Sequence, residues 1–201
     1  MIQDGNVAFK VTWVYGEHGP FTTPCTPNGR EHNIAEQKKV WCTQGQCPCF
    51  TIYKNGNTET YDVTARGCWP CYDSAIFDTW GFSGGVYHHG PKKNQSISIR
   101  HFKKGKLAFF TSRRWDMAEK DRKIIGCFQI ARYEKDKDHR FDKKMLFAGD
   151  LKLRVRDLEK APRFWNFHVQ TAGPLWGTGL FRYIPDQEAR AMLRAVEAVA
   201  V

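Results

Sequence analysis

Two apolar runs separated by a charged segment constrain the fold of this chain most. Residues 106–111 (KLAFFT) are rich in aromatic side chains and follow the turn signal Lys104-Gly105. Residues 123–130 (KIIGCFQI) form a second run with a glycine inside it. Short apolar runs bounded by turn residues are typical of buried strands, so both runs predict strands of one sheet. Residues 112–122 hold four basic and three acidic residues and Trp115, and they predict an exposed loop or short helix.

Further elements are predicted from hydrophobic periodicity. Residues 6–15 alternate as a half-buried strand does, and other strand candidates are residues 145–147, 151–155 and one strand within 173–184. Helices are predicted at residues 72–80 and from Pro185 onward, the latter with one apolar face formed by Ala189, Met192, Leu193 and Val196. Short strands with long excursions favour an α+β fold with a bent mixed sheet or open β-barrel and flanking helices.

The net charge indicates a class of partner. The chain has 201 residues, enough for one domain with a sizeable core, and a formal net charge of +10. Such an excess of lysine and arginine favours nucleic acid, although solubility alone is the simpler explanation. No apolar run approaches the roughly 18 residues that cross a bilayer, and the first residues do not resemble an export signal. We therefore expect a cytoplasmic protein without a membrane partner.

Six of the seven cysteines cluster in one part of the chain and suggest a structural zinc ion. Cys47-Pro48-Cys49 and Cys68-Trp69-Pro70-Cys71 flank a predicted hairpin, residues 50–53 and 58–63 around Asn55-Gly56. Two close cysteine pairs on either side of a hairpin are typical of a zinc ribbon, whose four protein ligands leave no open position for water. The candidate ligands are Cys25, Cys42, Cys47, Cys49, Cys68 and Cys71.

Other readings of the cysteines stay open. Disulfides are disfavoured by the absence of an export signal, the cysteines can also be unrelated, and His18 and His32 are further possible ligands. A zinc deaminase is excluded because His32 and Glu36 have the wrong spacing and Gly67-Cys68 replaces the required Pro-Cys. Cys127, in the second apolar run, is predicted to be a small core residue.

A glycine-rich loop at residues 81–97 predicts one wall of a binding pocket. It carries Tyr87, His88 and His89 on a flexible backbone, followed by Lys92 and Lys93. Glycines let a backbone approach a ligand, aromatic rings stack on bases, and lysines meet phosphates. The alternative is an ordinary loop with solvated histidines. A metal site of a nuclease is unsupported because no acidic residue neighbours the histidines in this loop.

The order of several motifs resembles the EVE domain, a member of the PUA-like superfamily related to YTH domains. The motifs are residues 11–15 (VTWVY), 85–94 (GVYHHGPKKN), 104–112 (KGKLAFFTS), 124–130 (IIGCFQI) and 179–184 (GLFRYI), followed by a helix. The resemblance covers residues 1–15 and roughly 80–200, and it implies a single PUA-like domain over residues 1–201. Residues 17–75 would then be a cysteine-rich, zinc-binding insertion within it.

The resemblance implies a pocket for an extruded, often modified base, flanked by phosphate contacts. With the chemistry that a flipped base requires, the predicted pocket residues are Trp13, Gly85, Val86, Tyr87, His88, Asn94, Thr111, Ser112 and Arg182. Core packing is the alternative for Trp13. Predicted phosphate contacts are Lys92, Lys93, Arg113 and Arg114, with Trp115 as a wedge into the opened base stack. Residues 87–94 (YHHGPKKN) replace the usual arginine and asparagine of the family, so the ligand can differ too.

The resulting functional hypothesis is a reader without enzymatic activity and without catalytic residues. It would accommodate a modified base, such as a modified cytosine, in DNA rather than RNA. It would act as the recognition part of a modification-dependent restriction system, with a nuclease or helicase partner. Two alternatives remain open: a zinc-dependent nuclease using His88 or His89, and a zinc-stapled module for protein interaction.

Overall fold

The computed structural model describes two compact units. Described residues are 4–16, 19–21, 25–43, 47–56, 73–85, 87, 90–93, 95–135, 144–169, 173–177 and 179–201. One unit comprises Met1–Thr12 with Trp80–Val201, and the other comprises Trp13–Thr79. The insertion expected at residues 17–75 of a single domain stays a prediction. No helix in the described ranges combines the length and the apolar character that a membrane crossing requires.

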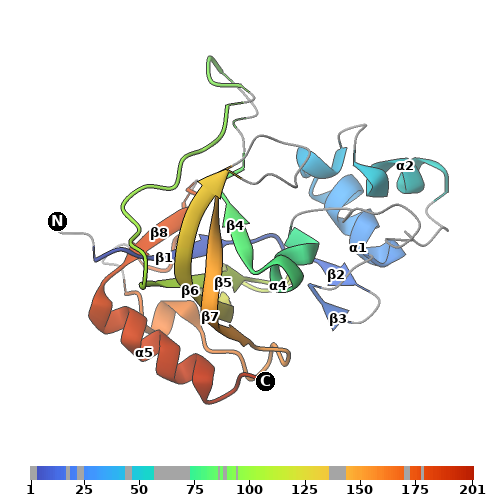
Figure 1. Ribbon diagram of the computed structural model, residues 1–201. Helices are drawn as coiled ribbons and strands as arrows, with labels where there is room; N and C mark the ends of the chain where they lie inside the picture. Colours follow the sequence, from blue (N-terminus) through green and yellow to red (C-terminus); the bar gives the residue numbers. More distant parts are fainter. Residues whose placement is uncertain are drawn as a thin grey trace. The chain divides into compact units, whose positions relative to one another are not determined.

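The first unit is built on a curled, mixed sheet of six strands (Figure 1). Its strand order is β4-β7-β6-β5-β1-β8. Strands β1 and β5 run parallel, and every other neighbouring pair runs antiparallel. The bounds are β1 (Asn6–Lys10), β4 (Gly81–Ser83), β5 (Leu107–Ser112), β6 (Lys123–Lys135), β7 (Lys144–Arg154) and β8 (Phe181–Ile184). The sheet curls into a half-barrel, which confirms the predicted α+β class with a bent mixed sheet.

The two strands predicted from the apolar runs are confirmed as β5 and β6, whereas the prediction for β7 was partly wrong. Two short strands were expected around Gly149-Asp150, but β7 continues through this dipeptide beside β6. The pairing shifts register between Phe128 and Ile130 and between Ile130 and Arg132. These irregularities absorb the break in alternation that suggested a turn, because a bulge bends a strand without ending it.

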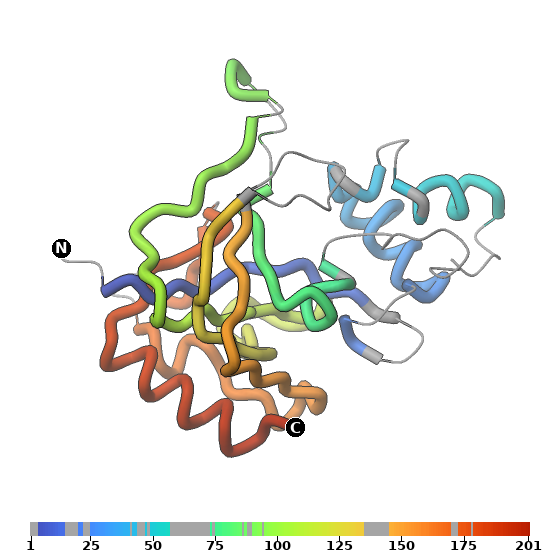
Figure 2. The backbone as a smooth tube through the Cα atoms, viewed as in Figure 1, coloured from blue at the N-terminus to red at the C-terminus, as the bar shows by residue number. Residues whose placement is uncertain are grey.

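The two faces of the sheet pack different side chains because alternate residues of a strand point to opposite sides. One face is covered by the helix α5 (Asp186–Glu197), which buries the predicted Ala189, Met192 and Val196. The segment between β7 and β8 runs beside this helix (Figure 2) and adds Phe164, Trp165 and Trp176 to the same core. The opposite face holds an aromatic cluster of Phe9, Phe82, Phe110 and Phe128.

Cys127 is a core residue, as predicted. It lies on β6 beneath α5 and is fully buried. Burial, with a smaller effect of the Glu197 carboxylate, raises the pKa of its thiol to about 12. A neutral thiol of this kind packs as a small apolar group and is a poor nucleophile.

In its described residues the second unit consists of short elements. They are β2 (Tyr15–Gly16), β3 (Gly19–Pro20), α1 (Pro27–Glu31), α2 (Pro48–Lys54), α4 (Ile76–Thr79), the π-helical turn η1 (His32–Glu36) and the 3-10 turns η2 (Trp41–Thr43) and η3 (Asp73–Ala75). The side chain of Thr26 caps α1 by accepting a hydrogen bond from the Gly29 amide at 3.2 Å. The predicted helix at residues 72–80 is confirmed in outline by η3 and α4.

The predicted hairpin of the second unit was wrong in its first strand. Residues 50–53 belong to the helix α2, which Pro48 opens in the first turn. Asn55 ends this helix, and Gly56 follows with a φ of +99°. An Asn-Gly pair fits a helix end as well as a two-residue hairpin turn because both need a left-handed residue. The partner strand expected at residues 58–63 lies outside the described residues.

Candidate nucleic-acid interface

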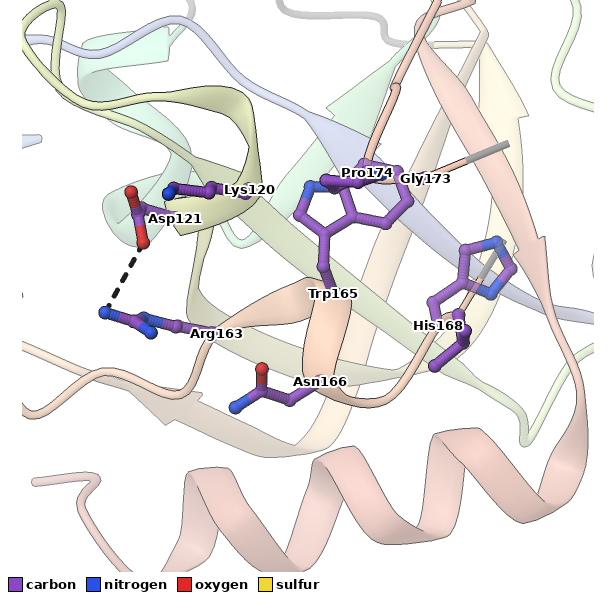
Figure 3. A pocket seen from close by; sticks show the side chains of 9 residues that line it. Lys120, Asp121, Arg163, Trp165, Asn166, His168, Gly173 and Pro174 are labelled. Carbon is purple, nitrogen blue, oxygen red and sulfur yellow. Dashed lines mark ion pairs between the residues drawn. The ribbon is translucent and has the colours of Figure 1, made fainter. Parts of the chain in front are cut away.

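A cavity of about 610 Å³ opens in the first unit next to the helix η5 (Phe164–Asn166). Figure 3 shows it between the turn η4 (Glu119–Asp121), η5 and the segment that follows η5. Its lining combines cationic, aromatic and amide side chains: Lys120, Asp121, Arg163, Trp165, Asn166, His168, Val169, Gly173 and Pro174. A volume of this size is typical of sites for small ligands.

The indole of Trp165 lies between the two ends of this cavity, and hydrogen bonds hold it there. Its ring N–H donates to the backbone carbonyl of Glu119 at 2.7 Å. The η5 segment is tied to the start of β6 by the amide of Phe164, which donates to the carbonyl of Arg122, and by the amide of Ile124, which donates to Pro162, both at 2.8 Å. Trp165 is 8% exposed, so its position is set by packing as well.

Polar groups surround the indole (Figure 3). Lys120 is exposed, and Arg163 pairs with Asp121 at 3.4 Å while 56% of its side chain stays exposed. His168 lies at the other end, where its Nδ1 is 2.7 Å from the Glu188 carboxylate. Such weakly paired, exposed cations at a rim are available to anions because a surface ion pair contributes little.

Arg113 and Arg122 form hydrogen bonds with Glu119, which belongs to the turn η4 beside the cavity. The guanidinium of Arg122, 2% exposed, donates to both carboxylate oxygens of Glu119 at 2.5 and 2.8 Å. Arg113 donates to the same carboxylate at 3.1 Å and to the Met117 carbonyl at 2.7 Å. Burial by itself raises the pKa of Glu119, but the hydrogen bond and charge of Arg122 and the charge of Arg113 outweigh it, and the pKa is lowered. Glu119 is therefore ionised at neutral pH.

Arg182 connects this network to the aromatic residues. Its guanidinium lies over the rings of Trp165 and Trp176, at 5.4 and 5.3 Å from their centroids, and donates to the backbone carbonyl of Trp176. Arg122 lies 4.9 Å from the Trp176 ring. Arg113 and Arg182, which the sequence assigned to two different groups of contacts, are thus brought together around Glu119 and two tryptophans. Burial lowers the pKa of Arg182.

Four other predicted site residues lie at the end of β5 and in the loop that follows it: Thr111, Ser112, Arg114 and Trp115. Thr111 and Ser112 are buried, and their hydroxyls donate to the carbonyls of Phe9 at 2.8 Å and Val11 at 3.0 Å. These hydrogen bonds tie β5 to the chain at and beyond β1. Arg114 pairs with Asp116 at 2.6 Å, which is the main reason for the lowered pKa of that exposed carboxyl. Trp115 is 44% exposed, and its role as a wedge stays a prediction.

The loop predicted as a pocket wall forms a narrow excursion after β4. The amide of Ile97 donates to the carbonyl of Gly85 at 2.9 Å, and the amide of Tyr87 donates to Gln95 at 3.0 Å. Tyr87 is exposed, with the ammonium of Lys92 5.8 Å from its ring centroid, and Lys93 is exposed as well. Val86, His88 and Asn94 lie outside the described residues. In Figure 1 this excursion lies well apart from α5 and the segment that packs beside it.

Trp13 belongs to the second unit, where it packs in the interior. Its ring meets that of Phe21 at a centroid distance of 5.2 Å, and Phe21 meets Phe77 at 6.0 Å. Trp13 is 6% exposed, and its indole N–H has no hydrogen-bond partner among the described residues. These contacts fit the alternative of core packing that the sequence left open.

Four of the six candidate zinc ligands are described, and all four carry free thiols. Cys25, Cys47 and Cys49 are buried, Cys42 is partly buried, and Cys68 and Cys71 lie outside the described residues. Hydrogen bonds from the thiols of Cys25 and Cys47, opposed by burial and aided by the charge of Arg30, lower the pKa of Cys49 to about 4. The hydrogen bond with Cys49 and burial raise the pKa of Cys47. In these ranges no three His, Cys, Asp or Glu side chains are already arranged to hold a metal ion.

The residues that line the cavity were missed by the sequence-based prediction. Residues 158–167 were interpreted only as a loop and helical turn that packs aromatics on the sheet. A usable signal was present in residues 163–168 (RFWNFH), where basic, aromatic and amide side chains alternate before Gly173-Pro174. Interleaved basic and aromatic residues are typical of nucleic-acid contacts. Comparison of the chain with family models, curated proteins and solved structures finds no match.

Proposed function

We propose that this protein is a nucleic-acid reader that holds one base in the cavity beside Trp165. The observation that supports this most is the composition of the cavity, an aromatic ring flanked by exposed cations and by amide and imidazole groups. The formal net charge of +10 supports an anionic partner. Lys120 and Arg163 would contact phosphates next to the base, and the indole of Trp165 would offer it an apolar surface.

The polar lining would supply the means to discriminate between bases. The amide of Asn166 both donates and accepts hydrogen bonds, and the imidazole of His168 has a nitrogen besides the one held by Glu188. A base must leave its stack to enter a cavity of this kind, and one that is damaged, mismatched or already single-stranded does so at least cost. The exposed Trp115 would fill the gap in the stack.

The finer part of the proposal rests on the resemblance to EVE domains. By that resemblance the base would be modified, and we favour a modified cytosine in DNA. The chain would be the recognition part of a modification-dependent restriction system. Strand cleavage or unwinding would come from a nuclease or helicase partner. The protein itself would bind without catalysis.

A binding screen over otherwise identical oligonucleotides tests this function. Duplexes and single strands carry one methylated, hydroxymethylated or unmodified cytosine, and affinities are measured by fluorescence anisotropy at fixed salt. We expect at least about a fivefold preference for one modified form, because a base-specific set of hydrogen bonds discriminates by about 1 to 3 kcal/mol. Equal affinity for all oligonucleotides would contradict base reading while leaving general nucleic-acid binding in place.

The same screen with Asn166→Ala separates base reading from phosphate binding. Asn166 is exposed and lines the cavity, so the change should leave the fold intact. The preference between bases should shrink to less than threefold, whereas affinity for unmodified DNA should stay within twofold of the parent. An unchanged preference would remove Asn166 from the set of residues that read the base.

Lys92 and Lys93 provide a prediction about the excursion after β4. Both side chains are exposed, and we expect the double change to alanine to reduce the slope of log affinity against log salt by about 2, one for each lost phosphate contact. The slope is measured by titrating one duplex at several salt concentrations. Lys103→Gln with Lys104→Gln is the matched control, because it removes two exposed lysines before the start of β5. If both double variants change the slope equally, the salt dependence of affinity is set by net charge and not by the position of Lys92 and Lys93.

A further inference from the structure

We infer that His168 makes the cavity beside Trp165 select bases that present an amino group, and that Glu188 fixes the imidazole tautomer that does so. The inference rests on the proposed function and adds to it the direction of one hydrogen bond, and with it a class of base. In this assignment His168 is a specificity-determining residue, and Glu188 is a positioning residue.

His168 directly follows η5, and its ring is held against the aromatic side chains there. Its backbone amide donates to the carbonyl of Phe164 at 3.2 Å. The centroid of its ring lies 5.4 Å from that of Phe164 and 6.2 Å from that of Trp165. Figure 3 shows the imidazole at one end of the cavity, and 15% of the side chain is exposed. These contacts leave the ring little room to change its orientation.

Glu188 is positioned by the start of α5, which the sheet holds in place. Asp186, the first residue of the helix, accepts hydrogen bonds from the side chains of Asn6 and Lys106, both at 2.8 Å. Glu188 lies in the first turn, where the helix dipole favours a carboxylate. Its Oε2 is 2.7 Å from Nδ1 of His168, and 28% of its side chain is exposed. The carboxylate is therefore fixed by the fold next to the imidazole.

This carboxylate determines which ring nitrogen of His168 carries the hydrogen. An ionised carboxylate only accepts hydrogen bonds, so Nδ1 must donate to it. In a neutral imidazole the other nitrogen then holds a lone pair and can only accept. Nε2 makes no hydrogen bond within the part of the chain that the structure describes. His168 therefore has one acceptor left for a ligand.

An acceptor at this position favours bases with an amino group. Cytosine carries the N4 amino group where thymine carries the O4 oxygen. The lone pair of Nε2 would accept from the amino group, whereas against thymine two acceptors would face each other and both would stay unpaired. A site built to hydrogen-bond a polar group strongly rejects an analogue that lacks it. Adenine, with its N6 amino group, belongs to the same class.

The test compares single-stranded oligonucleotides that carry either 5-methylcytosine or thymine at one position, by fluorescence anisotropy at about pH 8. The two bases share the pyrimidine ring and the methyl group, and they differ at position 4. We expect the parent to prefer 5-methylcytosine at least about fivefold. His168→Phe keeps an aromatic ring against Phe164 and Trp165 but has no ring nitrogen, so the preference should disappear.

Glu188→Gln separates control of the tautomer from packing. A glutamine amide both donates and accepts, so it allows either tautomer of His168. The preference should fall below about twofold although the imidazole is retained. Glu197→Gln is the matched control, because it removes one exposed carboxylate from the same helix and should keep the full preference. An equal loss of affinity for both oligonucleotides in Glu188→Gln would show a merely structural role and overturn the assignment of Glu188.

Nitrogen NMR of the free protein tests the tautomer without nucleic acid. Long-range proton–nitrogen correlations distinguish a ring nitrogen with a hydrogen from one with a lone pair, and the spectrum of His168→Phe assigns the signals. We expect a hydrogen on Nδ1 and none on Nε2 in the parent, and a mixture in Glu188→Gln. A hydrogen on Nε2 in the parent, or equal affinity for the two oligonucleotides, would overturn the inference. Absence of all nucleic-acid binding would overturn the proposed function and the base class with it, while the spectrum still shows whether Glu188 sets the tautomer.

Discussion

Replacing Glu119 by alanine is expected to lower the free energy of unfolding by about 3 to 5 kcal/mol. The change leaves the guanidinium of Arg122, 2% exposed, without the carboxylate that accepts two of its hydrogen bonds. Removing one partner of a buried ion pair costs more than the pair contributes, because the remaining charge stays desolvated. Urea denaturation followed by circular dichroism measures the loss.

The effect should depend on pH in a defined direction. Because Arg122 and Arg113 hold the folded pKa of Glu119 below its ordinary value of 4.5, its ionisation stabilises the fold fully above that value. This stabilisation is lost as the pH falls through the lower, folded pKa. The alanine variant lacks it at every pH, so the difference between parent and variant should narrow below pH 4.5.

Asp121→Ala is the control for this prediction. Asp121, in the same turn η4, also pairs with an arginine. That partner, Arg163, has a side chain that is 56% exposed and lies 3.4 Å away. A surface pair of this kind contributes about 0 to 1 kcal/mol, so this variant should keep nearly all of its stability. Equal losses in the two variants would show that the η4 turn, rather than the buried pair, determines stability.

Lys120→Gln combined with Arg163→Gln is expected to weaken nucleic-acid binding about 30-fold near 0.1 M salt, at about 1 kcal/mol for each phosphate contact. Both side chains line the cavity beside Trp165, and both are exposed. Neutral glutamines keep much of the side-chain length and the hydrogen-bonding capacity but release no counterions. The slope of log affinity against log salt should therefore fall by about 2.

Affinities of the parent and the variant for one duplex, measured from 0.05 to 0.3 M salt, decide this prediction. Lys103→Gln with Lys104→Gln removes the same number of charges before the start of β5 and should change affinity less than threefold. If the cavity variant matches the control, the cavity does not lie at the nucleic-acid interface. If both weaken binding 30-fold, attraction is spread over the whole surface.

Local patterns predicted the elements whose burial follows from their own periodicity. Strands β5 and β6 are confirmed because each is a short, continuous apolar run of the kind that forms a buried strand, and the apolar face of α5 is confirmed because its apolar residues recur at helical spacing. The first strand of the predicted hairpin was wrong, since residues 50–53 carry no decisive period and Asn55-Gly56 suits a turn and a helix end alike. Pro48, which occupies the first turn, favours the helix.

The sequence by itself determined the α+β class, the closing helix, the core position of Cys127 and the presence of a cysteine-rich region. It also pointed to Arg113 and Arg182 as residues of interest. Only the tertiary structure placed both arginines around Glu119 and two tryptophans, and only it joined η4 to η5 across the start of β6. The reason is physical: periodicity records which face of one element is buried, whereas a cavity depends on which distant elements hydrogen-bond and pack together.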